Sequence, residues 1–310
     1  MKKKLISIVT PCFNEEDNVD ELYTRVRRVM SKLNYQYEHI FIDNSSADGT
    51  AKKLRTLAAR DKCVKVILNT RNFGHVRSPV YAVLQAKGDA VIAMASDLQD
   101  PPERIPEFLQ KWEEGYPIVI GVKEKSDASA LFHFLRTIYY RFLRSLSDVN
   151  LIENFTGFGL YDRKVMDIVK MIDDPYPYFR GIVADLGFDI AKIVFTQPRR
   201  KHGLSKNNFY TLYDLAMLGI TSYTKVPLRI ATMFGFLSAL ISFLIGLTYL
   251  IYKLIFWYQF SLGSAPLVIG LFFLGSIQLM FLGIVGEYIG AIYTQVMHRP
   301  LVIEKERINF

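Results

Sequence analysis

Short apolar segments alternate with longer amphipathic ones through the first 120 residues. The apolar segments fall at 5–10, 39–43, 64–68, 90–94 and 118–121. They are rich in Ile and Val, which is typical of strands buried on both faces of a sheet. Between them, apolar residues recur with helical spacing at 19–33, 50–60, 76–86 and 105–114. This alternation predicts an α/β domain with a mostly parallel sheet covered by helices.

The polar residues of this region gather directly after the predicted strands. They form four clusters, at 11–18, 43–50, 71–75 and 97–103. Because ligands of open α/β sheets bind beyond the carboxyl ends of the strands, we expect these clusters to form one site.

Two long uncharged stretches mark the C-terminal third of the chain. Residues 230–252 and 254–286, runs of 23 and 33, contain no charged side chain. A membrane-spanning helix needs about 20 apolar residues. The pattern therefore predicts two transmembrane helices, at about 230–256 and 266–290. The alternative is a helix pair buried in a soluble protein.

Positive residues flank both predicted spans. Lys225 and Arg229 precede the first, and Arg299, Lys305 and Arg307 follow the second, whereas the loop at 257–265 is uncharged. This distribution predicts a hairpin in the cell (inner) membrane with both termini cytoplasmic. The apolar segment at 5–10 is too short for a secretion signal.

Two further helices are predicted at 131–146 and 207–223. Each combines aromatic and apolar residues, and Arg136, Arg141 and Arg144 are interleaved in the first. Such helices lie in the headgroup layer of a membrane, or they pack as ordinary amphipathic helices.

The net charge of +8 favours an anionic partner: lipid headgroups, phosphates or nucleic acid. A nucleic-acid-binding module would leave the hairpin unexplained, so lipid is the preferred partner. The two cysteines, Cys12 and Cys63, lack metal-site spacing, and a cytoplasmic setting is against a disulfide between them.

The clusters after the first two strands suit a nucleotide. Asp43, at a strand end, can accept hydrogen bonds from a ribose or a base, whereas Asp48 and Gly49 are typical of a turn that caps the next helix. The segment 11–16 could be only an acidic helix start. Neither strand is followed by a Gly-x-Gly-x-x-Gly fingerprint, which argues against a dinucleotide oxidoreductase.

The cluster at 97–103 suits a divalent cation. Oxygen ligands at a strand end can hold Mg²⁺ or Mn²⁺ together with a diphosphate, and the cation would neutralise charge on a leaving nucleotide. The alternative is that Asp97 or Asp100 caps the helix that Pro101 and Pro102 begin.

Taken in order, these segments resemble the family 2 glycosyltransferases with a GT-A fold. The resemblance is strongest to the polyprenyl-phosphate glycosyltransferases, which include dolichol-phosphate mannosyltransferase and bactoprenol glucosyltransferases. It covers nearly the whole chain and rests on the segments 11–18, 43–50, 71–74, 97–103, 203–206, 227–229 and 286–290.

The resemblance implies four parts of the chain. They are a cytoplasmic GT-A catalytic domain at 1–206, a juxtamembrane amphipathic helix at 207–228, two transmembrane helices within 229–296 and a cytoplasmic tail at 297–310. The implied reaction is inverting transfer of a sugar from a nucleotide-sugar, UDP-glucose or another UDP-hexose, to undecaprenyl phosphate. Membrane lipids and further copies of the chain are the other implied partners.

The resemblance also implies residue roles. The nucleotide-sugar would contact Pro11, Phe13, Glu15, Asp43, Arg71 and Asp97. The metal, Mg²⁺ or Mn²⁺, would lie on Asp97 and Gln99. The acceptor phosphate would be held by Lys123, Arg136, Arg200 and Lys206. Of these, Asp97, Arg136 and Lys206 would be catalytic.

Three positions depart from the family pattern. Ala95 and Asn44 stand where relatives often have Asp, and Thr156-Gly157-Phe158 replaces a Gly-Asp-Phe sequence. These departures motivate an alternative function, a catalytically degenerate nucleotide-binding scaffold subunit. A processive polysaccharide synthase would need more membrane helices and a Gln-x-x-Arg-Trp motif, which the sequence lacks. Glu287 is expected to have a structural role, paired with Arg229 or Arg299.

Overall fold

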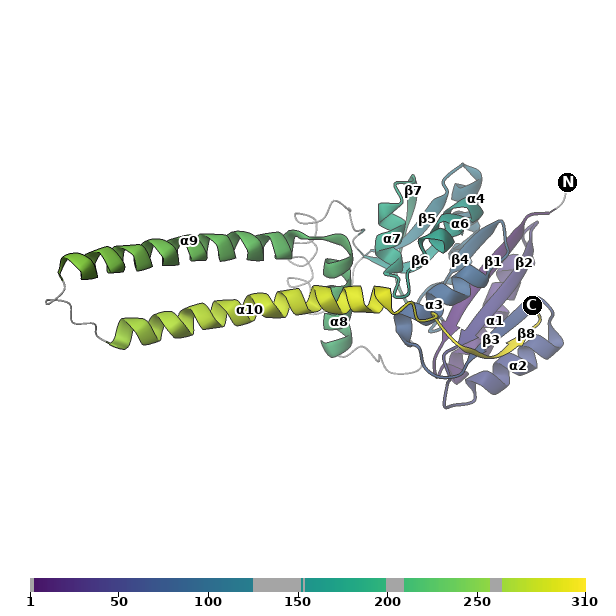
Figure 1. The fold of residues 1–310 in the computed structure, drawn as a ribbon. Coiled ribbons are helices and arrows are strands. Elements are labelled where there is room, and N and C mark those ends of the chain that lie inside the picture. The colour runs from purple at the N-terminus through teal and green to yellow at the C-terminus, as the bar shows by residue number, and fades with distance from the viewer. Residues whose placement is uncertain (1–2, 125–151, 153, 199–208, 257–263) are drawn as a thin grey trace.

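A mixed eight-stranded sheet forms the centre of the computed structural model, and two long helices project from it (Figure 1). The structure describes residues 3–124, 152, 154–198, 209–256 and 264–310. The helix predicted at 131–146 and three predicted site residues, Arg136, Arg200 and Lys206, lie outside these ranges.

The strand order is β7-β5-β6-β4-β1-β2-β3-β8. Parallel pairing joins β1 to β2 and β4, β2 to β3, and β5 to β7, whereas β6 and β8 run antiparallel to their neighbours. The predicted mostly parallel sheet is therefore confirmed. The strands are β1 Leu5–Cys12, β2 Gln36–Asp43, β3 Val64–Asn69, β4 Ala90–Ala93, β5 Ile118–Lys123, β6 Phe155–Asp162, β7 Ile190–Phe195 and β8 Glu304–Ile308.

Helices cover both faces of the sheet. One core lies beneath α1, α2 and α4, and the other beneath α3, α6 and α7. Successive β1 side chains alternate between the two cores, with Ile8 in the first and Val9 in the second, as strand geometry requires. These helices are α1 Glu16–Met30, α2 Thr50–Arg60, α3 Gly74–Gln85, the short 3₁₀ helix η1 Pro102–Arg104, α4 Ile105–Glu113, α6 Arg163–Ile172 and α7 Phe179–Asp185.

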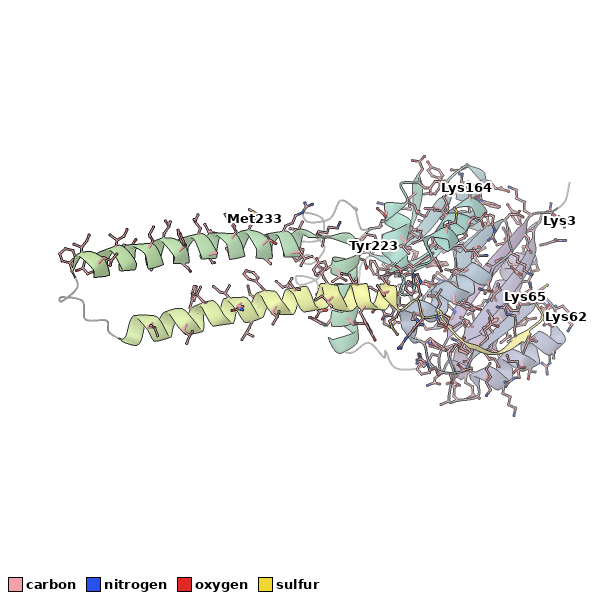
Figure 2. The ribbon with its side chains drawn as sticks, in the orientation of Figure 1. Lys3, Lys62, Lys65, Lys164, Tyr223 and Met233 are labelled. Carbon is pink, nitrogen blue, oxygen red and sulfur yellow. The ribbon has the colours of Figure 1, made fainter. Side chains whose placement is uncertain are left out.

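The two projecting helices are α9 (Val226–Ile255) and α10 (Ser264–Val296), preceded by α8 (Phe209–Tyr223). Their apolar segments Val226–Thr248 and Phe273–Val296 are long enough to span a membrane, and only 6% and 0% of the residues are buried. Figure 2 shows Met233 projecting outward from α9, where its side chain is 72% exposed. The alternative of a helix pair buried in a soluble core does not match this exposure.

Helix α8 crosses the base of α10 and is hydrogen-bonded to it. The Tyr213 hydroxyl donates to Glu287 Oε1 at 3.0 Å, and the Tyr288 hydroxyl donates to the carbonyl of Thr224 at 2.6 Å. The predicted pairing of Glu287 with Arg229 or Arg299 is wrong for the described residues. The phenol of Tyr213, which α8 places beside α10, is the partner of Glu287 instead.

The segment after α10 returns to the domain and adds strand β8 at the edge of the sheet. β8 runs antiparallel to β3, Glu306 forms a 2.7 Å ion pair with Arg55, and the Thr70 amide donates to the Ile303 carbonyl at 3.0 Å. The sequence pattern indicated no strand at 304–308. The C-terminal end of the hairpin is thus held by the α/β domain.

Buried His39 makes the stability of the sheet sensitive to acid. Its Nε2 lies 3.0 Å from Thr10 Oγ1, its ring packs on Phe41, and burial lowers its pKa to about 3. The folded state therefore binds a proton less readily than the unfolded state, so stability is present above pH 6.5 and is lost as pH falls towards 3.

The pKa shift of His39 corresponds to a loss of roughly 4 to 5 kcal/mol of unfolding free energy in the native chain as pH falls from 6.5 towards 3. We expect His39→Gln to reduce this loss. The measurement is the thermal unfolding midpoint of the detergent-solubilised protein at pH 4 to 8. His298→Gln, at an exposed position, is the matched control. If the unfolding midpoint falls equally steeply with pH in the native chain and in His39→Gln, His39 is not the source of the acid sensitivity.

Candidate active site

The turns after β1 and β2 are held against each other by the parallel pairing of these strands. Cys12 lies opposite Asp43 in the register, so both strands end at the same edge of the sheet. The Asn14 amide donates to Ser46 Oγ at 2.8 Å, and the Ala47 amide donates to Asn14 Oδ1 at 2.8 Å. The two polar clusters therefore form one surface, as the sequence predicted.

Three turns at this edge contain a residue with left-handed backbone. The φ angles of Asn14, Ser45 and Leu98 are 55°, 62° and 62°. For residues other than glycine this conformation costs about 1 kcal/mol, and the surrounding contacts must compensate for it. Such strain concentrates at functional sites, which supports a site at these strand ends.

The two aspartates after β2 have different surroundings. Asp43 is buried and accepts hydrogen bonds from the amide, at 3.1 Å, and the hydroxyl of Ser46; burial raises its pKa. Asp48 instead accepts from the amide of Thr50 at 3.0 Å and from that of Glu16 at 3.2 Å. Asp48 thus bonds the start of α2, the next helix, as predicted, and it also bonds the start of α1, which was not predicted.

Asn44 organises the loop that follows β3. Its Oδ1 accepts from the Phe73 amide at 2.9 Å, and its Nδ2 donates to Asn72 Oδ1 at 2.8 Å and to the Gly74 carbonyl at 3.2 Å. Only an amide side chain can accept and donate in this way, because a carboxylate has no proton to donate. The presence of Asn rather than Asp at this position therefore has a structural reason.

The remaining residues predicted to contact a nucleotide lie around these turns. Arg71 stacks on Phe73 with its guanidinium 4.2 Å from the ring centre. Glu15, two residues after Phe13, is buried and accepts from Asn18 Nδ2 at 2.5 Å. Pro11 lines a cavity described below.

A polar cavity of about 310 Å³ opens at the ends of β4, β5 and β6. Asp97, Gln99 and Lys123, three residues predicted from the sequence, all line it. Two further charged residues, Asp100 and Arg180, also line it. The cavity thus brings two carboxylates and two cationic groups together around a space that a small polar ligand can enter.

Asp100 is buried in the wall of the polar cavity. Its Oδ2 accepts from the Ala95 amide at 2.8 Å, so it closes the turn after β4, and η1 has no side-chain cap. Burial raises its pKa to about 6, nearby Asp97 adds to the rise, and Lys123 and Arg180 oppose it. The cap role that the sequence left open for Asp100 is therefore wrong.

Arg180 was not predicted from the sequence. It lies near the start of α7, directly after the aromatic residues Tyr178 and Phe179, in a segment that carries no recognisable motif. Its side chain lines the polar cavity together with Asp100 and Lys123. Only the folding of α7 against β6 places it beside Asp100.

The metal prediction was tested against the oxygen groups of this cavity. No group of three or more His, Cys, Asp or Glu side chains suited to a metal occurs in the described part of the chain. Asp97 Oδ1 accepts from the Gln99 amide at 3.1 Å, so both side chains lie on one tight turn. One carboxylate and one amide oxygen fit a Mg²⁺-like ion that takes its other ligands from substrate phosphates and water.

A second cavity, of about 210 Å³, adjoins the first and extends between α3 and α7. Ala95, Asp100, Thr156 and Arg180 line both cavities. The remaining walls of the second are mainly apolar, and we call it the apolar cavity.

We expect Asn44→Asp to lower the unfolding free energy by about 1 to 3 kcal/mol, because a buried carboxylate would face Asn72 Oδ1 and the Gly74 carbonyl. Thermal unfolding measures the loss, and Asn34→Asp at an exposed position is the control. Unchanged stability would show that Asn44 does not hold this loop.

For Asp100, the raised pKa means that the folded state favours the protonated acid. Its stabilising contribution is present below pH 4 and is lost as pH rises through 6. Asp100→Asn should therefore be more stable than the native chain above pH 7, by about 3 kcal/mol. The difference in thermal unfolding midpoint between Asp100→Asn and the native chain should vanish near pH 4. Exposed Asp167→Asn is the control. A difference that stays constant with pH would contradict the pKa assignment.

Comparison with known proteins places this site in a family. Residues 7–169 match glycosyl transferase family 2. The chain is 33% identical to an uncharacterized glycosyltransferase of Synechocystis sp., covering 96% of this chain and 94% of that protein. It is 35% identical to the bactoprenol glucosyl transferase of Shigella phage SfV, covering 97% and 98%.

Among solved structures, mannosyl-3-phosphoglycerate synthase from Rubrobacter xylanophilus aligns with 69% of this chain and 71% of its own, at 16% identity and a TM-score of 0.47. The family match spans β1 to α6, and the relatives extend over the projecting helices as well. The chain therefore belongs to glycosyl transferase family 2.

Proposed function

We propose that the protein transfers a hexose, with inversion, from a nucleotide-sugar to polyprenyl phosphate at a membrane surface. The observation that carries the proposal is the polar cavity, in which Asp97 and Gln99 face Lys123 and Arg180 at the strand ends. A reaction between two phosphate-bearing substrates needs this combination of oxygen ligands and cations.

The relatives support a lipid acceptor. A protein 35% identical over 97% of this chain is named bactoprenol glucosyl transferase, and bactoprenol is a polyprenyl lipid. The exposed apolar surfaces of α9 and α10 agree with this acceptor, because they suit a bilayer rather than water. We propose that the α/β domain and both termini lie on the cytoplasmic side, as the Lys and Arg residues at the helix ends favour.

The nucleotide would lie along the turns after β1, β2 and β3. Asp43 would accept hydrogen bonds from the ribose or base, and Pro11, Phe13, Glu15 and Arg71 would complete the pocket. The position of Asp43 supports this role, since it ends β2 at the edge of the sheet where β1 and β4 also end.

The diphosphate would lie in the polar cavity. Asp97 and Gln99 would hold a Mg²⁺ or Mn²⁺ ion on its oxygens, and the bound ion would lower the cost of negative charge on the departing nucleoside diphosphate. Lys123 and Arg180, which also line the cavity, would offset the negative charge of the diphosphate. A second phosphate could then approach without strong repulsion.

In the reaction, an oxygen of the acceptor phosphate attacks the anomeric carbon. The bond from that carbon to the donor diphosphate breaks, and the nucleoside diphosphate leaves in line. A phosphate monoester is ionised near pH 7, so no side chain need remove a proton. Lys123, with Arg136, Arg200 and Lys206 from the segments outside the described ranges, would hold the acceptor.

The first candidate donor is UDP-glucose, which follows from the sequence resemblance. The test uses the full chain purified in detergent with undecaprenyl phosphate, Mg²⁺ or Mn²⁺ and a panel of radiolabelled nucleotide-sugars. Label should pass from one donor into an organic-extractable lipid. Asp97→Ala should lower the rate by at least about 100-fold, whereas exposed Asp167→Ala should not.

The outcomes separate the parts of the proposal. If lipid labelling persists in excess EDTA, the proposed metal requirement is wrong and the proposed transfer reaction still stands. If no donor labels lipid under conditions in which the Shigella phage relative does so, the transferase assignment is wrong. The departures at Ala95 and Gly157 would then favour a nucleotide-binding scaffold.

A further inference from the structure

The chain that follows α10 lies along one face of α3 before it forms β8 (Figure 1). Arg77, Tyr81 and Gln85, spaced four residues apart on α3, all hydrogen-bond to it. Arg77 Nη2 donates to the Pro300 carbonyl, and the Tyr81 hydroxyl donates to Glu304 Oε1 at 2.9 Å. Residues four apart share one face of a helix. Other residues of α3 line the apolar cavity, so this face lies outside the candidate active site.

Three arginines gather where this face of α3 meets the end of the hairpin. Arg71 and Arg77 lie over the same ring, that of Phe73, with their guanidinium carbons 4.2 Å and 5.6 Å from its centre. Burial lowers the pKa of Arg77, and the nearby positive charges of Arg71 and Arg299 lower it further. We call Arg71, Arg77 and Arg299 the arginine cluster.

The surroundings of Arg77 favour an anion. Its Nε is buried and, within the described residues, has no hydrogen-bond partner. Glu304, the acidic residue that contacts the same face of α3, is engaged by Tyr81 and by Arg307, whose Nε lies 2.9 Å from Glu304 Oε2. An unsatisfied buried donor beside two further positive charges is stabilised by a negatively charged acceptor.

The position of Arg299 indicates where such an anion would come from. Arg299 follows the apolar segment Phe273–Val296 by three residues. Three residues of extended chain span at most about 10 Å, and the headgroup layer of a bilayer is roughly 5 to 8 Å thick on each side. An arginine at this position therefore reaches the lipid phosphates when the hairpin spans a membrane.

We propose that Arg77 and Arg299, with the charge of Arg71 beside them, bind the phosphate of an anionic phospholipid headgroup and so tie the end of the hairpin to α3. Guanidinium groups suit this ligand, because each offers paired N–H donors to phosphate oxygens. The inference rests on the membrane placement proposed above and not on the transfer reaction. The site is separate from the polar cavity, which none of the three arginines lines.

The test measures the binding of phosphatidylglycerol and of phosphatidylcholine to the full chain in a neutral detergent by native mass spectrometry. Phosphatidylglycerol should bind the native chain with a Kd at least about 10-fold lower, because several arginines act on a headgroup of net negative charge. Arg77→Gln and Arg299→Gln should each reduce this preference about 5-fold, which is the contribution of one arginine near anionic lipid.

A matched variant separates a specific site from general attraction. Lys225→Gln removes one positive charge at the start of α9, at the same end of the hairpin, and should leave the preference unchanged (Figure 1). Arg299 is exposed, so Arg299→Gln keeps the test decisive if Arg77→Gln, which loses the bond to Pro300, folds poorly.

Four results would overturn the inference. One is an equal Kd for the two lipids in the native chain. Another is an equal loss of preference in Lys225→Gln and Arg299→Gln, because the lipid would then respond only to overall surface charge. Displacement of phosphatidylglycerol by excess inorganic phosphate would show that the cluster binds free phosphate instead. Displacement by undecaprenyl phosphate, with a raised KM for that acceptor in Arg299→Gln, would assign the cluster to the acceptor.

The binding measurement needs no turnover. Its failure therefore leaves the transferase function standing, and failure of the lipid-labelling assay leaves the binding result standing.

Discussion

The parallel pairing of β1 with β2 and β4 is the constraint on which the site depends. Cys12 lies opposite Asp43 in the β1–β2 register, and Val9 lies opposite Ala93 at the end of β4. Because the three strands end together, the polar turns after them open at one edge. The backbone strain at Asn14, Ser45 and Leu98 is tolerated because this pairing fixes the strands from which the turns start.

The polar cavity balances charges that would be costly alone. Burial of Asp100 near Asp97 disfavours ionisation, and Lys123 and Arg180 offset part of that cost. Among the described residues, Asp97 and Gln99 are the proposed metal ligands, so that a bound diphosphate would complete the coordination of an ion. We infer that affinity for metal and affinity for donor are coupled, since each supplies charge that the other lacks.

The two-helix hairpin and the α/β domain are joined at two places. Gln295, near the end of α10, donates to Asp174 Oδ1 at 2.8 Å, and the chain after α10 returns as β8 beside β3. β8 also covers what would be an exposed edge of the sheet, where unpaired backbone groups invite association. The β3 edge adjoins the loop at 72–74 that Asn44 holds, so the anchoring of the hairpin and the ordering of this loop depend on the same strand.

The sequence by itself determined the alternation of strands and helices, the two apolar spans, and the residues Asp97, Gln99 and Lys123 that line one cavity. These follow from local periodicity and from polar residues placed at strand ends, which act over a few positions of the chain. Tertiary structure alone decided the roles of Arg180, β8, the Tyr213 partner of Glu287, and the meeting of Arg77 with Arg299. Each depends on segments distant in the chain packing together, and that packing is set by the shape of the whole core rather than by any local pattern.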